Sequence, residues 1–176
     1  MRYRPLAAVA ATALAALPQL CAAALAVPAS VEELALASSA VVRGRVARTE
    51  ARWSQDHLRI ETLAEVEVAS AWRGAAPARL EVVLPGGAVD GLAQRVVGAP
   101  RLAAGEEVVL FLWRGGDAAH YRVAGLAQGK FTVAGVAARP DLSGTTFVPR
   151  ARLRAGDRRV EAMALDELER RVRSVP

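Results

Sequence analysis

The segment Leu58–Ala71 constrains the fold of this chain most, because polar and apolar residues alternate along it. One parity carries Ile60, Thr62, Ala64, Val66 and Val68, and the other carries Arg59, Glu61, Leu63, Glu65 and Glu67. A period of two predicts a β-strand with one face on a core and the other in water. The strand is longer than the usual roughly 5–6 residues. Such length is typical of small barrels, in which one curved strand serves two halves of the sheet.

Shorter strands are expected on either side of this segment. They are Ala40–Thr49, Arg79–Leu84, Gln94–Val97, Glu107–Trp113, Tyr121–Ala124, Lys130–Val136 and Thr145–Leu153. The run at Glu107–Trp113 is continuously apolar, which indicates a strand buried on both faces. Several short strands separated by turn residues predict a mainly β protein, either a small OB-like β-barrel or a sandwich, with a barrel core at about 40–154.

Two helices are expected to flank the strands. Ser30 and Glu33 have the spacing of a capping box, which predicts a short helix at about 31–37. An extended segment with the same residues is the alternative. Leu165, Leu168 and Val172 share one side of an amphipathic helix expected at about 163–173, which would close the domain.

The first 26 residues have the three parts of a secretory signal peptide. Arg2 and Arg4 form a positive n-region, Leu6–Leu17 is an uncharged apolar h-region, and Ala24-Leu25-Ala26 offers a small-x-small cleavage pattern. We therefore expect export to the periplasm or the medium, with 1–26 removed and 27–176 forming one domain without a transmembrane span. A retained anchor and a lipid on Cys21 are the alternatives, although the apolar run is shorter than the roughly 20 residues that span a bilayer.

Cleavage after Ala26 would also limit the chemistry of the mature protein. Cys21 is the single cysteine of the chain, so its removal would leave no disulfide, no cysteine nucleophile and no thiolate metal ligand. The formal net charge would fall from +5 to +3, because Arg2 and Arg4 would be lost without any acidic residue. Export and this mild charge argue against a nucleic-acid partner.

Five stretches between Ser30 and Val136 resemble an uncharacterised family of exported bacterial β-domains. They are Val41–Arg48, Trp72-Arg73-Gly74, Pro85-Gly86-Gly87, Gly105–Leu112 and Gly125–Phe131. The resemblance implies export and a β fold, and it carries no known activity. The order of the elements is also similar to the netrin-like module of the tissue metalloproteinase inhibitors, an OB-type barrel. Those inhibitors chelate zinc through an amino-terminal cysteine, whereas the mature chain would start at Val27 without one.

Few residues carry a signature of catalysis or of metal binding. Asp56 and His57 could form the acid–base pair of a hydrolase, but no serine of the chain lies in a Gly-x-Ser-x-Gly elbow. A solvated loop histidine is the simpler interpretation. Asp56, His57 and His120 lack the spacing of a metal site, so we expect no metal and no cofactor.

Two charged groups have both a functional and a simpler interpretation. Glu61, Glu65 and Glu67 could serve as glycosidase carboxylates, but neighbouring arginines would neutralise them on a solvated face. The densest basic cluster consists of Arg150, Arg152, Arg154, Arg158 and Arg159. It could touch anionic lipid or polysaccharide, or it could form a solvated edge that discourages pairing between sheets.

We therefore predict a non-catalytic binding or accessory module whose partner is an unknown protein or a component of the cell envelope. The glycine-rich stretch Pro85–Gly105 is long and carries apolar residues, which favours an ordered, functional loop. The expected contact residues are Trp72, Arg73, Val89, Asp90, Leu92 and Gln94, whereas Trp113 is expected in the core. A hydrolase that uses Asp56 and His57, and an inhibitor of an exported protease, are the alternatives.

Overall fold

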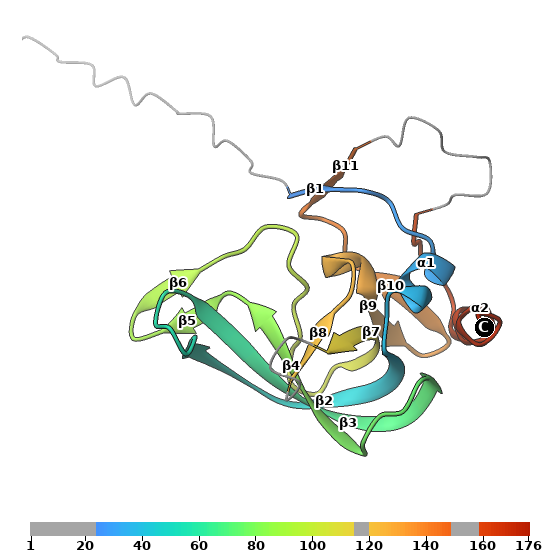
Figure 1. Ribbon diagram of the computed structural model, residues 1–176, viewed down its shortest axis with the longest axis horizontal. Coiled ribbons are helices and arrows are strands. Elements are labelled where there is room, and N and C mark those ends of the chain that lie inside the picture. Colours follow the sequence, from blue (N-terminus) through green and yellow to red (C-terminus); the bar gives the residue numbers. More distant parts are fainter. Residues whose placement is uncertain (1–23, 115–119, 149–158) are drawn as a thin grey trace, which may run out of the picture.

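The computed structural model describes residues 24–114, 120–148 and 159–176 (Figure 1). Strands make up 50% of the structure and helices 14%. It contains a closed five-strand β-barrel, a short helix near the N-terminus and a helix at the C-terminus. The predicted fold class is thereby confirmed, and the barrel is selected over the sandwich.

Five strands form the barrel: β2 (Ala40–Trp53), β3 (Ile60–Arg73), β4 (Arg79–Pro85), β7 (Glu107–Arg114) and β8 (Tyr121–Val123). In sheet order β7, β2, β3 and β4 are antiparallel neighbours. β8 closes the barrel, because it pairs antiparallel with β7 and parallel with β4. The five barrel strands therefore lie between Ala40 and Val123, within the range of about 40–154 expected for the barrel core.

The long alternating segment is β3, and its partner β2 has the same length of 14 residues. β2 continues to Trp53, further than the expected end at Thr49, so the turn to β3 is shorter than the sequence suggested. The turn end of this hairpin lies beside β5 (Gly87–Val89) and β6 (Leu92–Gln94), at the end of the molecule opposite the C-terminal helix (Figure 1).

The remaining strands extend the barrel on the β7 side. β9 (Lys130–Ala134) pairs with β7, β10 (Ala137–Pro140) with β9, and β12 (Met163–Ala164) with β10. A separate parallel pair joins β1 (Ala24–Ala26) to β11 (Thr145–Phe147). β1 contains the small residues of the expected cleavage pattern, so cleavage after Ala26 would remove this strand.

The predicted helices are present. α1 (Val31–Leu36) begins at Ser30 with both hydrogen bonds of a capping box, which confirms the helical interpretation. α2 (Leu165–Arg173) contributes Leu168 and Val172 to the core. A 3₁₀ turn, η1 (Leu126–Gly129), leads into β9. Among the described residues, none of the helices is long and apolar enough to cross a bilayer.

The stretch after β4 differs from expectation. A single strand was expected at Gln94–Val97, but the chain forms the β5–β6 hairpin instead, and β6 ends at Gln94. Asp90 and Gly91 occupy the turn with φ of 51° and 75°, the left-handed geometry that two-residue hairpin turns require. The strand expected at Thr145–Leu153 is β11 and ends at Phe147, and residues 149–153 lie outside the described part of the chain.

Candidate functional site

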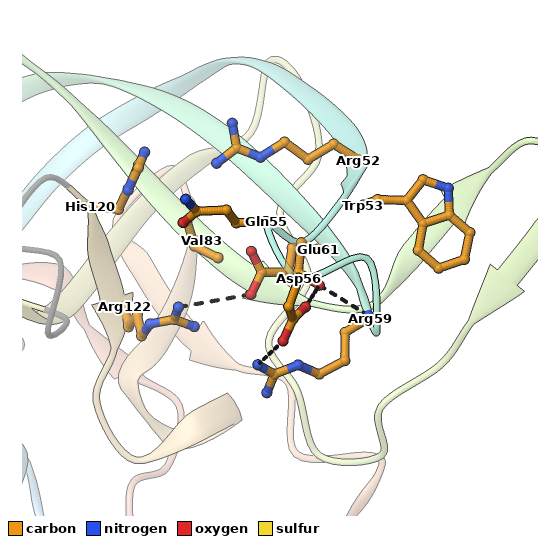
Figure 2. A pocket seen from close by; sticks show the side chains of 10 residues that line it. Arg52, Trp53, Gln55, Asp56, Arg59, Glu61, Val83, His120 and Arg122 are labelled. Atoms are coloured by element: carbon orange, nitrogen blue, oxygen red, sulfur yellow. Dashed lines mark hydrogen bonds and ion pairs between the residues drawn. The ribbon is translucent and has the colours of Figure 1, made fainter.

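An open cleft of about 760 Å³ lies beside the turn that joins β2 to β3 (Figure 2). It is lined by residues of β2, the turn, β3, β4 and the start of β8. Glu61 and Val83 line it, whereas Leu84, the sequence neighbour of Val83, belongs to the barrel interior. The cleft therefore lies on the outer face of β3 and β4, and we call it the outer cleft.

The turn that forms one wall is held by Ser54 and Asp56. The buried Ser54 hydroxyl donates to Asp56 Oδ1 at 2.5 Å and accepts from the Arg59 amide at 3.0 Å. Asp56 also accepts from the Leu58 amide at 3.1 Å. The Ser54 hydrogen bond, followed by that of Leu58, lowers the pKa of Asp56 below its ordinary value. Asp56 is therefore ionised at neutral pH and orders the turn.

This geometry separates the two residues of the hydrolase hypothesis. The Asp56 carboxylate contacts Ser54, the Leu58 amide and, at 3.7 Å, the Arg59 guanidinium. His57 is exposed and has a φ of 56° at the tip of the turn. No hydrogen bond between Asp56 and His57 occurs among the described contacts, so Asp56 does not orient His57 as the carboxylate of a catalytic triad orients its histidine.

The charges in the outer cleft are only partly paired. Arg59 faces Asp56, and Arg122 lies 3.8 Å from Glu61, as Figure 2 shows. Arg52 lines the same cleft, and within the described residues it has no hydrogen bond or ion pair to a carboxylate. Among the described residues, the cleft thus presents the unpaired Arg52 guanidinium beside two ion pairs that are too long to be strong.

Two hydrogen bonds of the predicted contact residues Asp90 and Gln94 join the β5–β6 hairpin to the β2–β3 hairpin. Trp53 Nε1 donates to Asp90 Oδ2 at 3.1 Å, which ties the β5–β6 turn to the end of β2. Figure 2 shows the indole pointing away from the charged groups. Gln94 Oε1 accepts from the Ile60 amide at 2.7 Å. Asp90 and Gln94 therefore fix the hairpin on the barrel.

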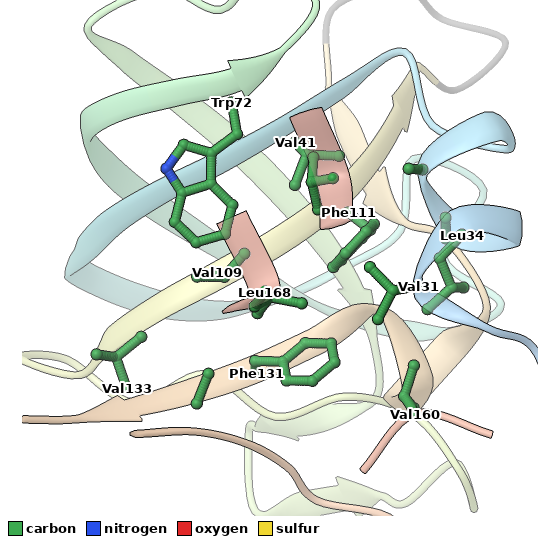
Figure 3. Packing of buried hydrophobic residues seen from close by; sticks show 14 residues of the cluster. Val31, Leu34, Val41, Trp72, Val109, Phe111, Phe131, Val133, Val160 and Leu168 are labelled. Atoms are coloured by element: carbon green, nitrogen blue, oxygen red, sulfur yellow. The ribbon is translucent and has the colours of Figure 1, made fainter. Parts of the chain in front are cut away.

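The other predicted contact residues are divided between two ends of the molecule. Val89 and Leu92 lie beside Asp90 on the β5–β6 hairpin. Trp72 is only 5% exposed and packs in a core cluster with Val41 and Phe111 (Figure 3). Arg73 donates to the carbonyl oxygens of Val175 and Pro176 at 2.9 and 2.8 Å. Trp72 and Arg73 therefore do not belong to a surface shared with the loop.

The three glutamates of the long strand lie among arginines. Arg48 donates to Glu65 at 2.8 Å and Arg79 to Glu67 at 2.9 Å. The Arg48 hydrogen bond lowers the pKa of Glu65, whereas the acid of a glycosidase needs a raised pKa. The solvated-face interpretation fits these contacts better.

Two further predictions concern metals and the basic cluster. Within the ranges that the structure describes, no three or more His, Cys, Asp or Glu side chains are grouped to hold a metal ion. Arg150, Arg152, Arg154 and Arg158 lie outside the described residues. Arg159, which is described, stacks over the Phe147 ring at 5.8 Å.

Sequence reasoning missed the outer cleft as a site. Asp56, Glu61 and His120 were each considered from the sequence and all three line the cleft, but no local pattern places them together. The cleft itself depends on the closure of β8 against β4, which brings Arg122 to Glu61 from 61 residues away in the chain.

Comparison of the chain with protein-family models, with curated proteins and with solved structures found no match. The geometry of the outer cleft is therefore the basis for the functional proposal.

Proposed function

We propose that this protein is an exported, non-catalytic binding module with an OB-like barrel, and that the outer cleft binds an acidic oligosaccharide of the cell envelope. The observation that carries the proposal is the position of the cleft. It lies over the second and third barrel strands and is bounded by the turn between the first two strands and by the start of the last strand.

The strand order supports the OB-like assignment. Numbered along the chain, the barrel strands close in the order 1-2-3-5-4-1, with strands 3 and 5 parallel. OB-folds are five-stranded Greek-key barrels that bind oligonucleotides and oligosaccharides over strands 2 and 3 and the loops 1–2 and 4–5. Ser54–Arg59 is the corresponding first loop, and His120 ends the second.

The chemistry of the cleft favours an acidic sugar chain. Arg52 offers a guanidinium that a carboxylate can bind with two hydrogen bonds. Gln55, Asp56 and Glu61 add amide and carboxylate groups that suit sugar hydroxyls. A nucleic acid is a less suitable ligand, because the signal-peptide pattern of residues 1–26 predicts export.

A titration with defined oligosaccharides tests this proposal. We expect an oligogalacturonate to shift the amide resonances of Glu61, Val83 and Arg122 in ¹H–¹⁵N NMR spectra, and its methyl-esterified form to bind at least about tenfold more weakly. Arg52→Gln should weaken binding by a similar factor. Arg170→Gln, at an exposed position of α2, is the matched control. Equal affinity for the esterified chain, or for single-stranded DNA, would contradict the proposal.

Export has a separate test. The mass of the mature protein recovered from the periplasm or the medium of an expressing bacterium should correspond to a chain without the signal peptide. A protein that stays in the cytoplasm with residues 1–26 intact would contradict export while leaving the sugar-binding proposal standing.

A further inference from the structure

A second cleft, distinct from the outer cleft, opens on the other side of the β2–β3 hairpin. It has a volume of about 420 Å³ and lies at one mouth of the barrel, beneath the β5–β6 hairpin and the segment that follows it. Ala51 and Thr62 line this cleft, whereas their neighbours Arg52 and Glu61 line the outer cleft. We call it the mouth cleft.

The floor of the mouth cleft is apolar. Leu84 and Leu102 line it and also belong to the barrel-interior cluster, with 3% and 8% of their surfaces exposed. Ala51 and Pro100 add further hydrocarbon. A ligand that enters the cleft can therefore bury an apolar group against the barrel core.

The rim of the mouth cleft carries positive charge. Arg95 and Arg101 line it, and none of the described residues that line it is acidic. Neither guanidinium has an ion pair or a side-chain hydrogen bond among the described residues. The pKa of Asp141 is lowered chiefly by its hydrogen bonds to Ser143, and Arg101 contributes only through its charge at longer range. The two arginines are thus available to an anion.

Contacts within the protein hold the walls of the mouth cleft in place without a ligand. Thr62 Oγ1 donates to the Gly86 carbonyl at 2.7 Å, and the Gly86 amide donates to the Ile60 carbonyl at 2.8 Å. Gly87, with a φ of 148°, passes so close to β2 and β3 that a Cβ there would lie 2.8 Å from Thr62 Oγ1 and 2.9 Å from Ala51 Cβ. A pocket held by such contacts is preformed, as small-molecule sites usually are.

From these features we propose that the mouth cleft binds a small organic carboxylate, with the carboxylate between Arg95 and Arg101 and an apolar tail on Leu84 and Leu102. Arginine pairs with carboxylates through two parallel hydrogen bonds. The volume falls within the range of roughly 300–1,000 Å³ that is typical of small-molecule pockets. This site is independent of the proposed sugar site on the opposite face of the hairpin.

Hexanoate is a suitable probe. Hexan-1-ol, which lacks the charge, and acetate, which lacks the apolar tail, are partial probes. We expect saturable binding of hexanoate in ¹H–¹⁵N NMR titrations, with a Kd of about 1 mM or lower and with shifts at Thr62, Gly86 and Gly87. Hexan-1-ol and acetate should each bind at least about tenfold more weakly, because each retains only half of the contacts.

Variants assign the binding to this cleft. Arg95→Gln combined with Arg101→Gln should raise the Kd of hexanoate at least tenfold, about the effect of losing charge-assisted hydrogen bonds. Ala99→Leu should block the cleft while keeping both arginines. Arg170→Gln should leave the Kd unchanged, and so should Arg52→Gln, which separates this site from the sugar site. The proposal would be overturned if hexan-1-ol bound as tightly as hexanoate, if the Arg95→Gln, Arg101→Gln double variant kept the wild-type Kd, or if the hexanoate titration did not saturate.

Discussion

The two faces of the sheet formed by β2, β3 and β7 cover cores of different kinds. One face lines the barrel interior with side chains such as Val42, Val66 and Leu110. The other face carries Val41, Val109 and Phe111, which pack against α1, α2 and β9 (Figure 3). We call these the interior cluster and the outer cluster. Leu110 and Phe111 are adjacent on β7, are both fully buried, and point to opposite clusters.

The two clusters differ in how the chain assembles them. Most members of the interior cluster lie on barrel strands that pair with their neighbours. The outer cluster joins both ends of the described chain, from Val31 in α1 to Val172 in α2. Polar contacts tie these ends together, among them the ion pair between Glu32 and Arg171. The interior should therefore form with the sheet, whereas the outer cluster depends on contacts between distant segments.

The largest expected effects come from truncating the two neighbours on β7. Phe111→Ala should cost about 4 kcal/mol of unfolding free energy and Leu110→Ala about 3 kcal/mol, because each leaves a cavity in a fully buried site. Phe111 also loses its contact with Phe131, whose ring centroid is 5.9 Å away. Urea unfolding followed by circular dichroism measures both values. If Phe111→Ala cost less than about 1 kcal/mol, the outer cluster would be a loosely attached layer. It would then not be a second core comparable to the interior cluster.

The face of β9 opposite the outer cluster provides the second comparison. Phe131 and Val133 point to the outer cluster, whereas Lys130 and Thr132 point to the other face and meet Glu106. The side chains of Lys130 and Glu106 are only 7% and 17% exposed. Glu106→Gln should cost about 3 kcal/mol, because it leaves a buried ammonium without its counter-charge.

The control for this ion pair removes both charges. Glu106→Gln combined with Lys130→Met should recover most of the lost stability, since replacing both partners of a buried pair is often nearly neutral. Urea unfolding of the wild type, the two single variants and the double variant gives the coupling energy. A double variant as unstable as the sum of the single variants would show that the two residues act independently.

The sequence predicted the interior cluster better than the outer one. The alternation of β3 identifies Ala64 and Val66 as interior residues, and both are fully buried there. Trp72 has the same parity as Ala64 and Val66 but does not face the barrel interior. The reason is a register shift, because β2 pairs Val41 with Arg73 and Val42 with Ala71 and thus skips Trp72. Trp72 consequently lies in the outer cluster, and its ring is not available at the surface. No local pattern marks such a register shift in advance.

The prediction for Trp113 was wrong in the opposite direction from that for Trp72. It was expected in the core because it ends an apolar run, but it is 41% exposed. Trp113 lies where β7 pairs with β8 rather than with β2, opposite Arg122. Burial on both faces of β7 therefore ends at Leu112. The outer cleft was missed for a similar reason, since it needs the parallel contact between β4 and β8 that no short stretch of sequence encodes.

A smaller effect should follow from removing the helix cap of α1, which belongs only to the outer cluster. The Ser30 hydroxyl accepts from the Glu33 amide at 3.2 Å, and the Ser30 amide donates to the Glu33 carboxylate at 2.9 Å. Ser30→Ala should cost about 1 kcal/mol. Thermal unfolding measures the loss, and Ser30→Asp, which keeps a capping oxygen, should restore it. A cost near zero would show that α1 is held by packing alone.

The smallest effect concerns the ion pair that joins α1 to α2. Arg171 donates to the two carboxylate oxygens of Glu32 at 2.7 and 2.8 Å. These hydrogen bonds lower the pKa of Glu32 from 4.5 to about 2. Because the folded pKa lies below the unfolded one, the stability from this pair is present above about pH 4.5 and is lost as the pH falls toward 2.

The pair is well exposed, with 41% of the Glu32 side chain and 30% of the Arg171 side chain accessible. Solvent screening therefore limits its contribution to about 0.5–1 kcal/mol. Glu32→Gln should remove that amount at pH 7 and almost nothing near pH 2, where the wild-type carboxyl is itself partly protonated. Urea unfolding of both proteins at the two pH values measures the difference. A difference that persists unchanged at pH 2 would mean that Glu32 stabilises the outer cluster by packing rather than by its charge.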